Sequence, residues 1–243
     1  MVNLTNIRAV IFDMDGLLVD SERLARVALV QTAGAFGIEN DPAVFAGMVG
    51  LPEDGSLALL TTRFGRDFPA REFLREAALA FDGLVAAGRL RAKPGAADFL
   101  NLLQRIEVRR AVATSSAQEK AARTLSKTRL IDHFELVVTR TDVTRGKPHP
   151  DLYLKAAADL GCPVSNCIAF EDSYNGVRAA HAADMRVIMI PDLLLPTAEM
   201  ENLTEAILPD LFAAAEAFRK FGLYPDLAAD PRAFVPEHDR SVR

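Results

Sequence analysis

Two short apolar runs in this chain of 243 residues each lead into a pair of carboxylic acids. The run Ala9–Phe12 is followed by Asp13 and Asp15, and a later run leads into Glu171 and Asp172. Carboxylates this close repel one another unless a cation or a shared proton lies between them. Their oxygens, together with water, are the ligands that Mg²⁺ prefers. The two pairs therefore indicate a cation site, although a helix-capping and a turn aspartate would also explain the first pair on its own.

Groups suited to a phosphate follow two other segments. Thr114 and Ser115 come directly after the run Arg110–Ala113, and their hydroxyls and the free N–H groups of a following helix suit a phosphate oxygen. An ordinary helix N-cap explains them equally well. In the segment GKPHPD, Lys147 is expected on a stiff, exposed loop, where its ammonium group can act as a point charge toward phosphate. A solvated surface lysine is the alternative interpretation there.

The elements that must position these groups are short, continuously apolar runs, which are typical of strands buried on both faces of a parallel sheet. Helix-length segments separate the later runs, and this alternation implies right-handed crossovers. We therefore predict the α/β class, with a doubly wound, Rossmann-like parallel sheet that binds ligands at the carboxyl ends of its strands. The five expected strands are Ala9–Phe12, Arg110–Ala113, Leu136–Thr139, Cys167–Phe170 and Val187–Ile190.

Local signals mark the ends of the helices that should connect these strands. Ser115 and Ser116 are expected to cap a helix at its N-terminus, and Gly161 is expected just past the C-terminus of another. Asp184 is expected in a left-handed turn. The expected helices are Pro94–Ile106, Ala117–Leu125, Asp151–Leu160 and Asn175–Ala183.

Nearly a hundred residues separate the first expected strand from the second, far more than one crossover requires. Apolar spacing in this stretch predicts the helices Leu24–Phe36, Ser56–Phe64 and Phe73–Val85. We therefore expect a helical module inserted after the first strand, with hinges at Gly16–Asp20 and Arg89–Pro94. The predicted organisation is a catalytic core (residues 1–20 and 90–221), a helical cap (21–89) and a C-terminal tail (222–243).

Composition narrows the class of partner. The formal net charge is −5 and the sequence pI is about 5.5, which argues against nucleic acid or a membrane surface as the partner. No apolar stretch approaches the roughly 20 residues that a membrane span requires, and no signal peptide is expected. Two cysteines, Cys162 and Cys167, form no disulfide framework. We therefore expect a cytoplasmic protein that acts on a small molecule, and the oligomeric state stays open.

Taken together, four motifs resemble those of the haloacid dehalogenase-like hydrolase superfamily in their order and spacing. The resemblance covers roughly residues 8–195, and the segments DGLLVDSE, ATSS and EDSYNGVRAA are similar to the β-phosphoglucomutase-like phosphatase branch with a helical cap. The motifs are DMDG with Asp13 and Asp15, the threonine Thr114, GKPHPD with Lys147, and EDS with Glu171 and Asp172.

The resemblance implies a Mg²⁺-dependent phosphatase that hydrolyses a small phosphate monoester, such as a sugar phosphate. Asp13 would be the nucleophile that forms an aspartyl-phosphate, and Asp15 would act as general acid and then general base. The implied ligands of Mg²⁺ are Asp13, Asp15 through its backbone carbonyl, and Asp172, with Glu171 in support. The implied phosphate-binding groups are Thr114, Ser115 and Lys147.

Other activities of the superfamily can be weighed at single positions. Dehalogenases lack the second aspartate, so Asp15 argues against them, and phosphonatases need a cap lysine, which residues 21–90 do not contain. The mutase carries a cap histidine where this chain has Ala25, and the segment AGMVGLPEDG contains no lysine or arginine. Hydrolysis is therefore favoured. A phosphomutase and a catalytically idle regulatory protein with the same fold stay open as alternatives.

Overall fold

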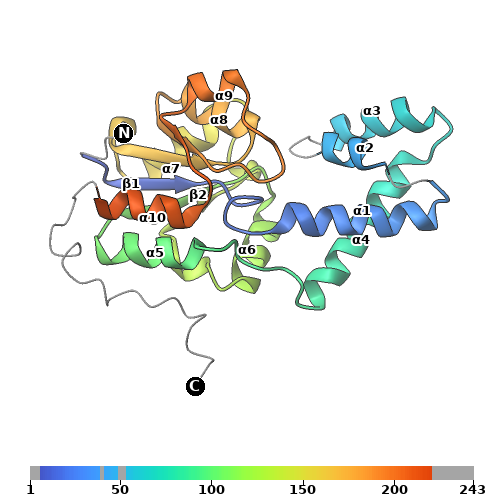
Figure 1. The fold of residues 1–243 in the computed structure, drawn as a ribbon, viewed down its shortest axis with the longest axis horizontal. Coiled ribbons are helices and arrows are strands. Elements are labelled where there is room, and N and C mark those ends of the chain that lie inside the picture. Colours follow the sequence, from blue (N-terminus) through green and yellow to red (C-terminus); the bar gives the residue numbers. More distant parts are fainter. Residues whose placement is uncertain (1–5, 39–40, 49–52, 221–243) are drawn as a thin grey trace.

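Six parallel strands form the central sheet of the computed structural model, which describes residues 6–38, 41–48 and 53–220. The strands lie side by side in the order β3-β2-β1-β4-β5-β6 (Figure 1). Each neighbouring pair is parallel, which confirms the predicted doubly wound, Rossmann-like α/β sheet. Their bounds are β1 Ala9–Phe12, β2 Arg109–Ala113, β3 Leu136–Val138, β4 Cys167–Glu171, β5 Arg186–Met189 and β6 Ala206–Ile207.

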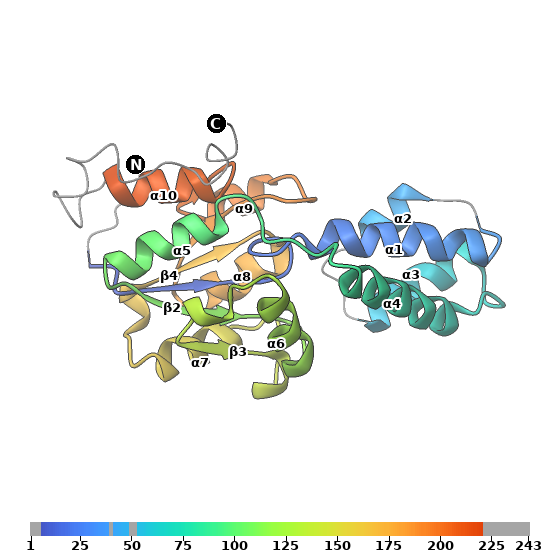
Figure 2. The same cartoon turned by 90° about the horizontal axis from the view of Figure 1, so that it is seen from below.

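The two central strands, β1 and β4, are buried along their whole length, because helices cover both faces of the sheet. Val10 and Phe12 pack into one apolar cluster, whereas Ala9 and Ile11 pack into another on the opposite face. The first cluster includes residues of α5 (Ala96–Arg105), α6 (Gln118–Lys127) and α10 (Leu211–Lys220). The second includes residues of α7 (Asp151–Asp159), α8 (Tyr174–Ala182) and α9 (Ala198–Leu203), and Figure 2 shows the layers edge-on.

The next four helices in the chain follow β1 and form a separate bundle beside the sheet (Figure 1). Phe45, Leu60 and Phe73 lie fully buried in an apolar cluster of the bundle's own. Aromatic packing within it includes the rings of Phe36 and Phe73, which meet edge to face with centroids 5.4 Å apart. The helices are α1 Ser21–Ala35, α2 Pro42–Gly47, α3 Glu53–Phe64 and α4 Ala70–Ala86.

The two connections between the bundle and the sheet run next to each other. The N–H of Asp20 donates to the carbonyl of Arg91 (3.0 Å), and the N–H of Lys93 donates to the carbonyl of Leu18 (2.8 Å). Val19 and Ala92 form an antiparallel bridge between these hydrogen bonds. The outgoing and returning segments therefore hold each other as a short two-stranded ribbon.

Several local expectations can be compared with the observed backbone. Gly161 and Asp184 both have positive φ angles, 61° and 56°, as predicted. The expected capping by Ser115 and Ser116 is wrong, because α6 begins at Gln118 with Ala117 as its N-cap residue. Three short elements, α2, α9 and β6, and the helix α10 were not predicted from the sequence. The predicted tail at 222–243 and residues 49–52 of the AGMVGLPEDG segment lie outside the described residues.

Candidate active site

The predicted site residues gather at the carboxyl edge of the sheet, where β1 has β2 on one side and β4 on the other. The crossovers run in opposite directions from β1, and in such sheets this reversal leaves a crevice in which ligands bind. Asp13 follows β1, Thr114 follows β2, and Asp172 follows β4. These residues line a cavity of about 360 Å³ together with Asp15 and Lys147.

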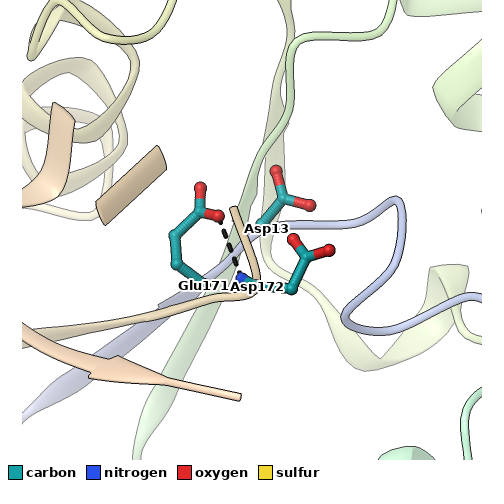
Figure 3. A group of neighbouring side chains, drawn as sticks. All are labelled: Asp13, Glu171 and Asp172. Carbon is teal, nitrogen blue, oxygen red and sulfur yellow. Dashed lines mark hydrogen bonds between the residues drawn. The ribbon is translucent and has the colours of Figure 1, made fainter. Parts of the chain in front are cut away.

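Two aspartates in this cavity are buried close to each other. Carboxylate oxygens of Asp13, Glu171 and Asp172 all lie within 4.8 Å of one another, and Figure 3 shows Asp13 beside Asp172 with Glu171 turned to the other side. Burial, with the charge of Glu171, raises the pKa of Asp13 to about 8 against the opposing effect of Lys147. Burial and the charge of Asp13 raise the pKa of Asp172 well above its ordinary value.

This donor set fits a hard divalent cation. A small cation such as Mg²⁺ binds carboxylate oxygens, and its charge would offset the burial and the repulsion that raise both pKa values. Among the described residues, none donates a hydrogen bond to the Asp172 carboxylate. At Gly16 an added Cβ would lie 2.1 Å from Asp172 Oδ2, so only glycine lets the backbone come this close to that oxygen. The Asp13–Asp172 pair is therefore the part of the cluster that is open to a metal.

Lys147 lies between the two acid pairs. Its ammonium group donates to Asp13 and, at 2.5 Å, to Glu171. The side chain is only 4% exposed, so the expectation of an exposed loop lysine is wrong. Burial acts to lower the pKa of Lys147, but the charges of Asp13 and Glu171 outweigh it and raise the pKa above its ordinary value. The lysine is thus a buried, fixed positive charge beside Asp13.

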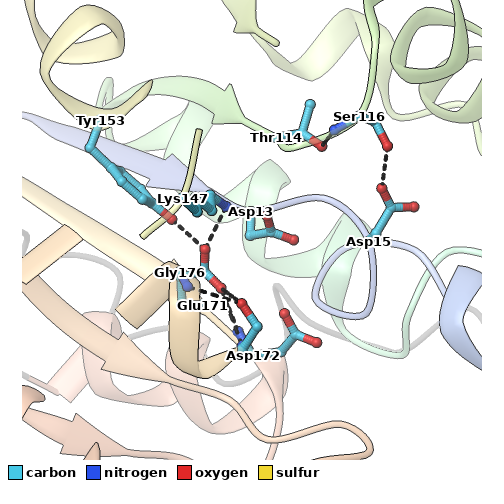
Figure 4. A network of polar contacts seen from close by, with 10 residues as sticks. Asp13, Asp15, Thr114, Ser116, Lys147, Tyr153, Glu171, Asp172 and Gly176 are labelled. Atoms are coloured by element: carbon cyan, nitrogen blue, oxygen red, sulfur yellow. Dashed lines mark hydrogen bonds and ion pairs between the residues drawn. The ribbon is translucent and has the colours of Figure 1, made fainter. Parts of the chain in front are cut away.

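Glu171 is held by several donors from the protein (Figure 4). The Tyr153 hydroxyl donates to it at 2.7 Å, and the other carboxylate oxygen accepts from the backbone N–H groups of Asp172 and Ser173 and from the Ser173 hydroxyl. A Cβ at Gly176 would lie 1.9 Å from the carboxylate carbon, so the helix α8 packs directly against this group. Glu171 is therefore held in place by donors from the protein, and it shares the Lys147 ammonium group with Asp13.

Replacing Tyr153 with phenylalanine removes one donor to the buried Glu171 carboxylate. A hydrogen bond to a charged group contributes roughly 1.5–3 kcal/mol, so we expect the free energy of unfolding to fall by that amount. Urea unfolding measures it. Tyr174→Phe is the matched control, because the Tyr174 hydroxyl donates to the Leu195 carbonyl at an exposed position. An equal fall in the free energy of unfolding in both variants would show that the buried hydrogen bond contributes no more to stability than the exposed one.

Asp15 lies apart from the acid cluster, on the side of the cavity that faces β2 and the helical bundle. The hydroxyls of Ser21 and Ser116 donate to its two carboxylate oxygens at 2.6 Å and 2.7 Å. The N–H of Ser116 in turn donates to the Thr114 hydroxyl at 3.0 Å (Figure 4). Ser116 therefore links two predicted site residues. Ser115 is exposed and lines the cavity.

Glu22 and Lys120 also line the cavity, although the motifs did not identify them. Glu22 is the last residue of the segment DGLLVDSE and lies in the first turn of α1. Burial and the charge of Asp15 raise the pKa of Glu22 to about 7, while the charge of Lys120 opposes this. The position of Glu22 in the segment DGLLVDSE was a usable signal for it. Lys120 had no such signal, because its place at the cavity depends on how α6 meets the bundle.

Comparison with known proteins identifies the family. The sequence model of one protein family, the haloacid dehalogenase-like hydrolases, matches residues 7–184. The chain therefore belongs to this family of enzymes. A Drosophila melanogaster protein named "probable pseudouridine-5′-phosphatase" is 32% identical over 203 residues, which cover 81% of this chain and 87% of that protein.

Within the described part of the chain, every helix is too short or too polar to cross a membrane.

Solved structures agree with this assignment. A HAD family hydrolase from Deinococcus radiodurans R1, with bound phosphate and sodium, is 29% identical and has a TM-score of 0.76, covering 89% of this chain and 97% of that one. The β-phosphoglucomutase of Clostridium difficile is 19% identical, with a TM-score of 0.71 and coverage of 92% and 100%, a likeness that concerns the fold. The family predicted from the four motifs is therefore confirmed.

Proposed function

We propose that this enzyme is a Mg²⁺-dependent phosphatase that hydrolyses a small phosphate monoester, such as a sugar phosphate, through an aspartyl-phosphate. The proposal rests on one observation: Asp13, Asp172 and the buried Lys147 line one cavity. The cavity lies at the carboxyl edge of the sheet, where the crossovers from β1 run in opposite directions. An acid cluster alone would repel a phosphate dianion. A cation and a fixed lysine make the same place attractive to it.

Each residue has a role that its position supports. Asp13 attacks phosphorus, and Lys147, which already donates to Asp13, stabilises the charge on the phosphoryl oxygens. Thr114 and Ser115 bind the remaining phosphoryl oxygens from the end of β2. Asp15, oriented by Ser21 and Ser116, protonates the leaving alcohol and later takes a proton from the attacking water.

Asp13 and Asp172, with the Asp15 backbone carbonyl, would hold Mg²⁺, and Glu171 supports them through Lys147. When bound, the ion neutralises negative charge on the phosphoryl group. We also propose that residues 21–89 act as a cap that closes over the site about the paired connections at Gly16–Asp20 and Arg89–Pro94. The free, buried thiols of Cys162 and Cys167 are compatible with the predicted cytoplasmic location.

Removal of the metal tests the proposal directly. Phosphate release from a panel of monoesters is expected to fall by at least about 100-fold when EDTA replaces Mg²⁺, because the acid cluster then loses its counter-charge. Added Mg²⁺ in excess of EDTA should restore the rate, which excludes irreversible damage. Equal rates with and without the metal would overturn the Mg²⁺ proposal.

The same panel separates the two alternatives. A phosphomutase would convert a sugar monophosphate into its isomer when a bisphosphate is supplied, without net phosphate release. Ala25 in place of a cap histidine argues against that activity. A catalytically idle protein would release no phosphate from any ester. All the motif acids are present in this chain, which favours an active enzyme.

A further inference from the structure

Four charged side chains meet at the paired connections between the bundle and the sheet. Asp20 belongs to the outgoing connection, Lys93 to the returning one, and Arg23 to the first turn of α1. Asp192 comes from the core, in the loop between β5 and α9. None of these four residues lines the catalytic cavity, and the proposed chemistry uses none of them. The group therefore needs an explanation of its own.

Asp192 is the buried member of this group. Its side chain is only 1% exposed, and its Oδ1 accepts a hydrogen bond from the Lys93 ammonium group at 2.7 Å. Arg23 Nε lies 3.6 Å from the same oxygen. The other oxygen, Oδ2, is buried and has no hydrogen-bond donor in the part of the chain that the structure describes. The core thus holds both cations through one carboxylate oxygen.

The burial of this carboxylate does not serve stability. A buried ion pair seldom stabilises a fold more than apolar residues of the same volume would, and an acceptor without a donor adds to its cost. The ion pair between Asp192 and Lys93 is therefore better explained by the chain segments that it fixes than by the stability that it adds.

Asp20 is the second acid beside the two cations. Its Oδ1 lies 3.5 Å from Arg23 Nε and 3.9 Å from Lys93 Nζ. An aspartate at the N-cap of a helix ordinarily accepts from the first N–H groups, but the Asp20 side chain makes no such bond to α1. The start of α1 is therefore held by the ion pairs and by the ribbon rather than by a side-chain cap.

The start of α1 in turn reaches Asp15. Ser21 directly follows Asp20, is buried, and donates its hydroxyl to Asp15 Oδ1 at 2.6 Å. The second oxygen of Asp15 accepts from Ser116 of the core at 2.7 Å. Asp15 is thus held from two sides, and a shift of α1 relative to the core would break one of its two hydrogen bonds.

We infer that Asp192 is a positioning residue for the reaction, which acts by holding Lys93 and Arg23. It thereby fixes the start of α1 against the core and keeps Ser21 within hydrogen-bond distance of Asp15. The inference rests on the proposed function, in which Asp15 protonates the leaving alcohol, and it adds a residue that lies outside the four motifs.

Two kinds of ester separate this role from a purely structural one. An alkyl phosphate such as glucose 6-phosphate releases an alcohol that needs a proton from Asp15, whereas p-nitrophenyl phosphate releases a stable phenolate that does not. General acid catalysis contributes roughly 10²–10⁴-fold, so its partial loss in Asp192→Asn should lower kcat/KM for the best alkyl ester by about tenfold. The value for p-nitrophenyl phosphate should fall by less than about twofold.

The ratio of the two kcat/KM values is the decisive quantity. A smaller folded fraction lowers both values equally and leaves their ratio unchanged, so a loss of stability cannot imitate the expected result. An unchanged ratio in Asp192→Asn would overturn the inference. If that variant does not fold, Asp192→Glu, which keeps the charge and displaces it by one methylene group, gives the same measurement.

The partner and a control complete the test. Lys93→Met should lower the ratio by a similar factor, and the double variant with Asp192→Asn should fall no further, because both changes remove one contact. Two falls that multiply would contradict the inference. Glu199→Gln is the matched control: Glu199 lies in α9, is 49% exposed and pairs with Arg178, so the ratio should stay within about twofold of the wild type.

The proposed function and this inference fail in different ways. No Mg²⁺-dependent phosphate release from any ester would remove the proposed function and the inference with it. Hydrolysis of both kinds of ester, with a ratio that the Asp192 variants leave unchanged, would keep the phosphatase and remove only the positioning role of Asp192.

Discussion

Replacing Asp13 with asparagine is expected to lower kcat by about 10⁴–10⁶-fold, the range for loss of one member of a catalytic unit, with loss of the covalent nucleophile at its upper end. The amide has the shape of the carboxylate but cannot attack phosphorus. The fold should survive, because the Asp13 N–H keeps its hydrogen bond to the Phe170 carbonyl and the side chain lies in a polar cavity. Phosphate release and a thermal melt measure the two quantities on one preparation.

Asp67→Asn is the matched control for this variant. Asp67 is exposed on the bundle, away from the catalytic cavity, so the same change of charge should leave kcat within about twofold of the wild type. Activity of Asp13→Asn close to that of the wild type would remove Asp13 from the nucleophilic role. Loss of activity together with loss of the folding transition would instead require the milder Asp13→Glu variant, which keeps the charge and displaces the attacking oxygen.

Replacing Lys147 with methionine is expected to cost both activity and stability. The ammonium group is the positive charge beside Asp13, and loss of one such contact to the transition state lowers kcat by roughly 10²–10³-fold. The same change leaves buried Glu171 without its cation, and breaking a buried ion pair from one side costs roughly 3–5 kcal/mol of unfolding free energy. Urea unfolding and phosphate release measure the two losses.

A second substitution separates the two losses. Adding Glu171→Gln to Lys147→Met removes the unpaired charge, so stability should return in part while kcat stays low. Lys155→Met serves as control, because Lys155 is 40% exposed and pairs with Asp159 within one helix; its effect should stay below about 0.5 kcal/mol. Recovery of activity in the double variant would show that Lys147 acts only through the fold.

The sheet could be predicted because its two central strands, β1 and β4, are buried along their whole length. Each of the five expected strands is present, with ends that differ by at most one residue, because a short and mostly apolar run between two layers of helices is typical of a buried strand. The strand β6 could not be predicted in this way. It has two residues, half-buried, and its place is set by pairing with β5 rather than by any pattern of its own.

Some features of the site could not be predicted because they depend on contacts between residues that lie far apart in the sequence. The edge location of Asp13, Thr114 and Asp172 follows from parallel strands, so the motifs were enough to bring them together. The burial of Lys147 depends on Glu171, a residue 24 positions later, and on the packing of Tyr153 beside it. The role of Ser116 as a donor to Asp15 rather than a helix cap likewise depends on an approach over 101 positions.

The paired connections at Leu18–Asp20 and Arg91–Lys93 have one more consequence. A chain segment whose ends are fixed side by side can change in length or sequence without displacing the strands it leaves and re-enters. The four-helix insertion can therefore be exchanged as a unit, because the hydrogen bonds between the two connecting segments do not depend on the helices that the insertion contains. The chemistry at the end of β1 and the four inserted helices can therefore evolve separately within one chain.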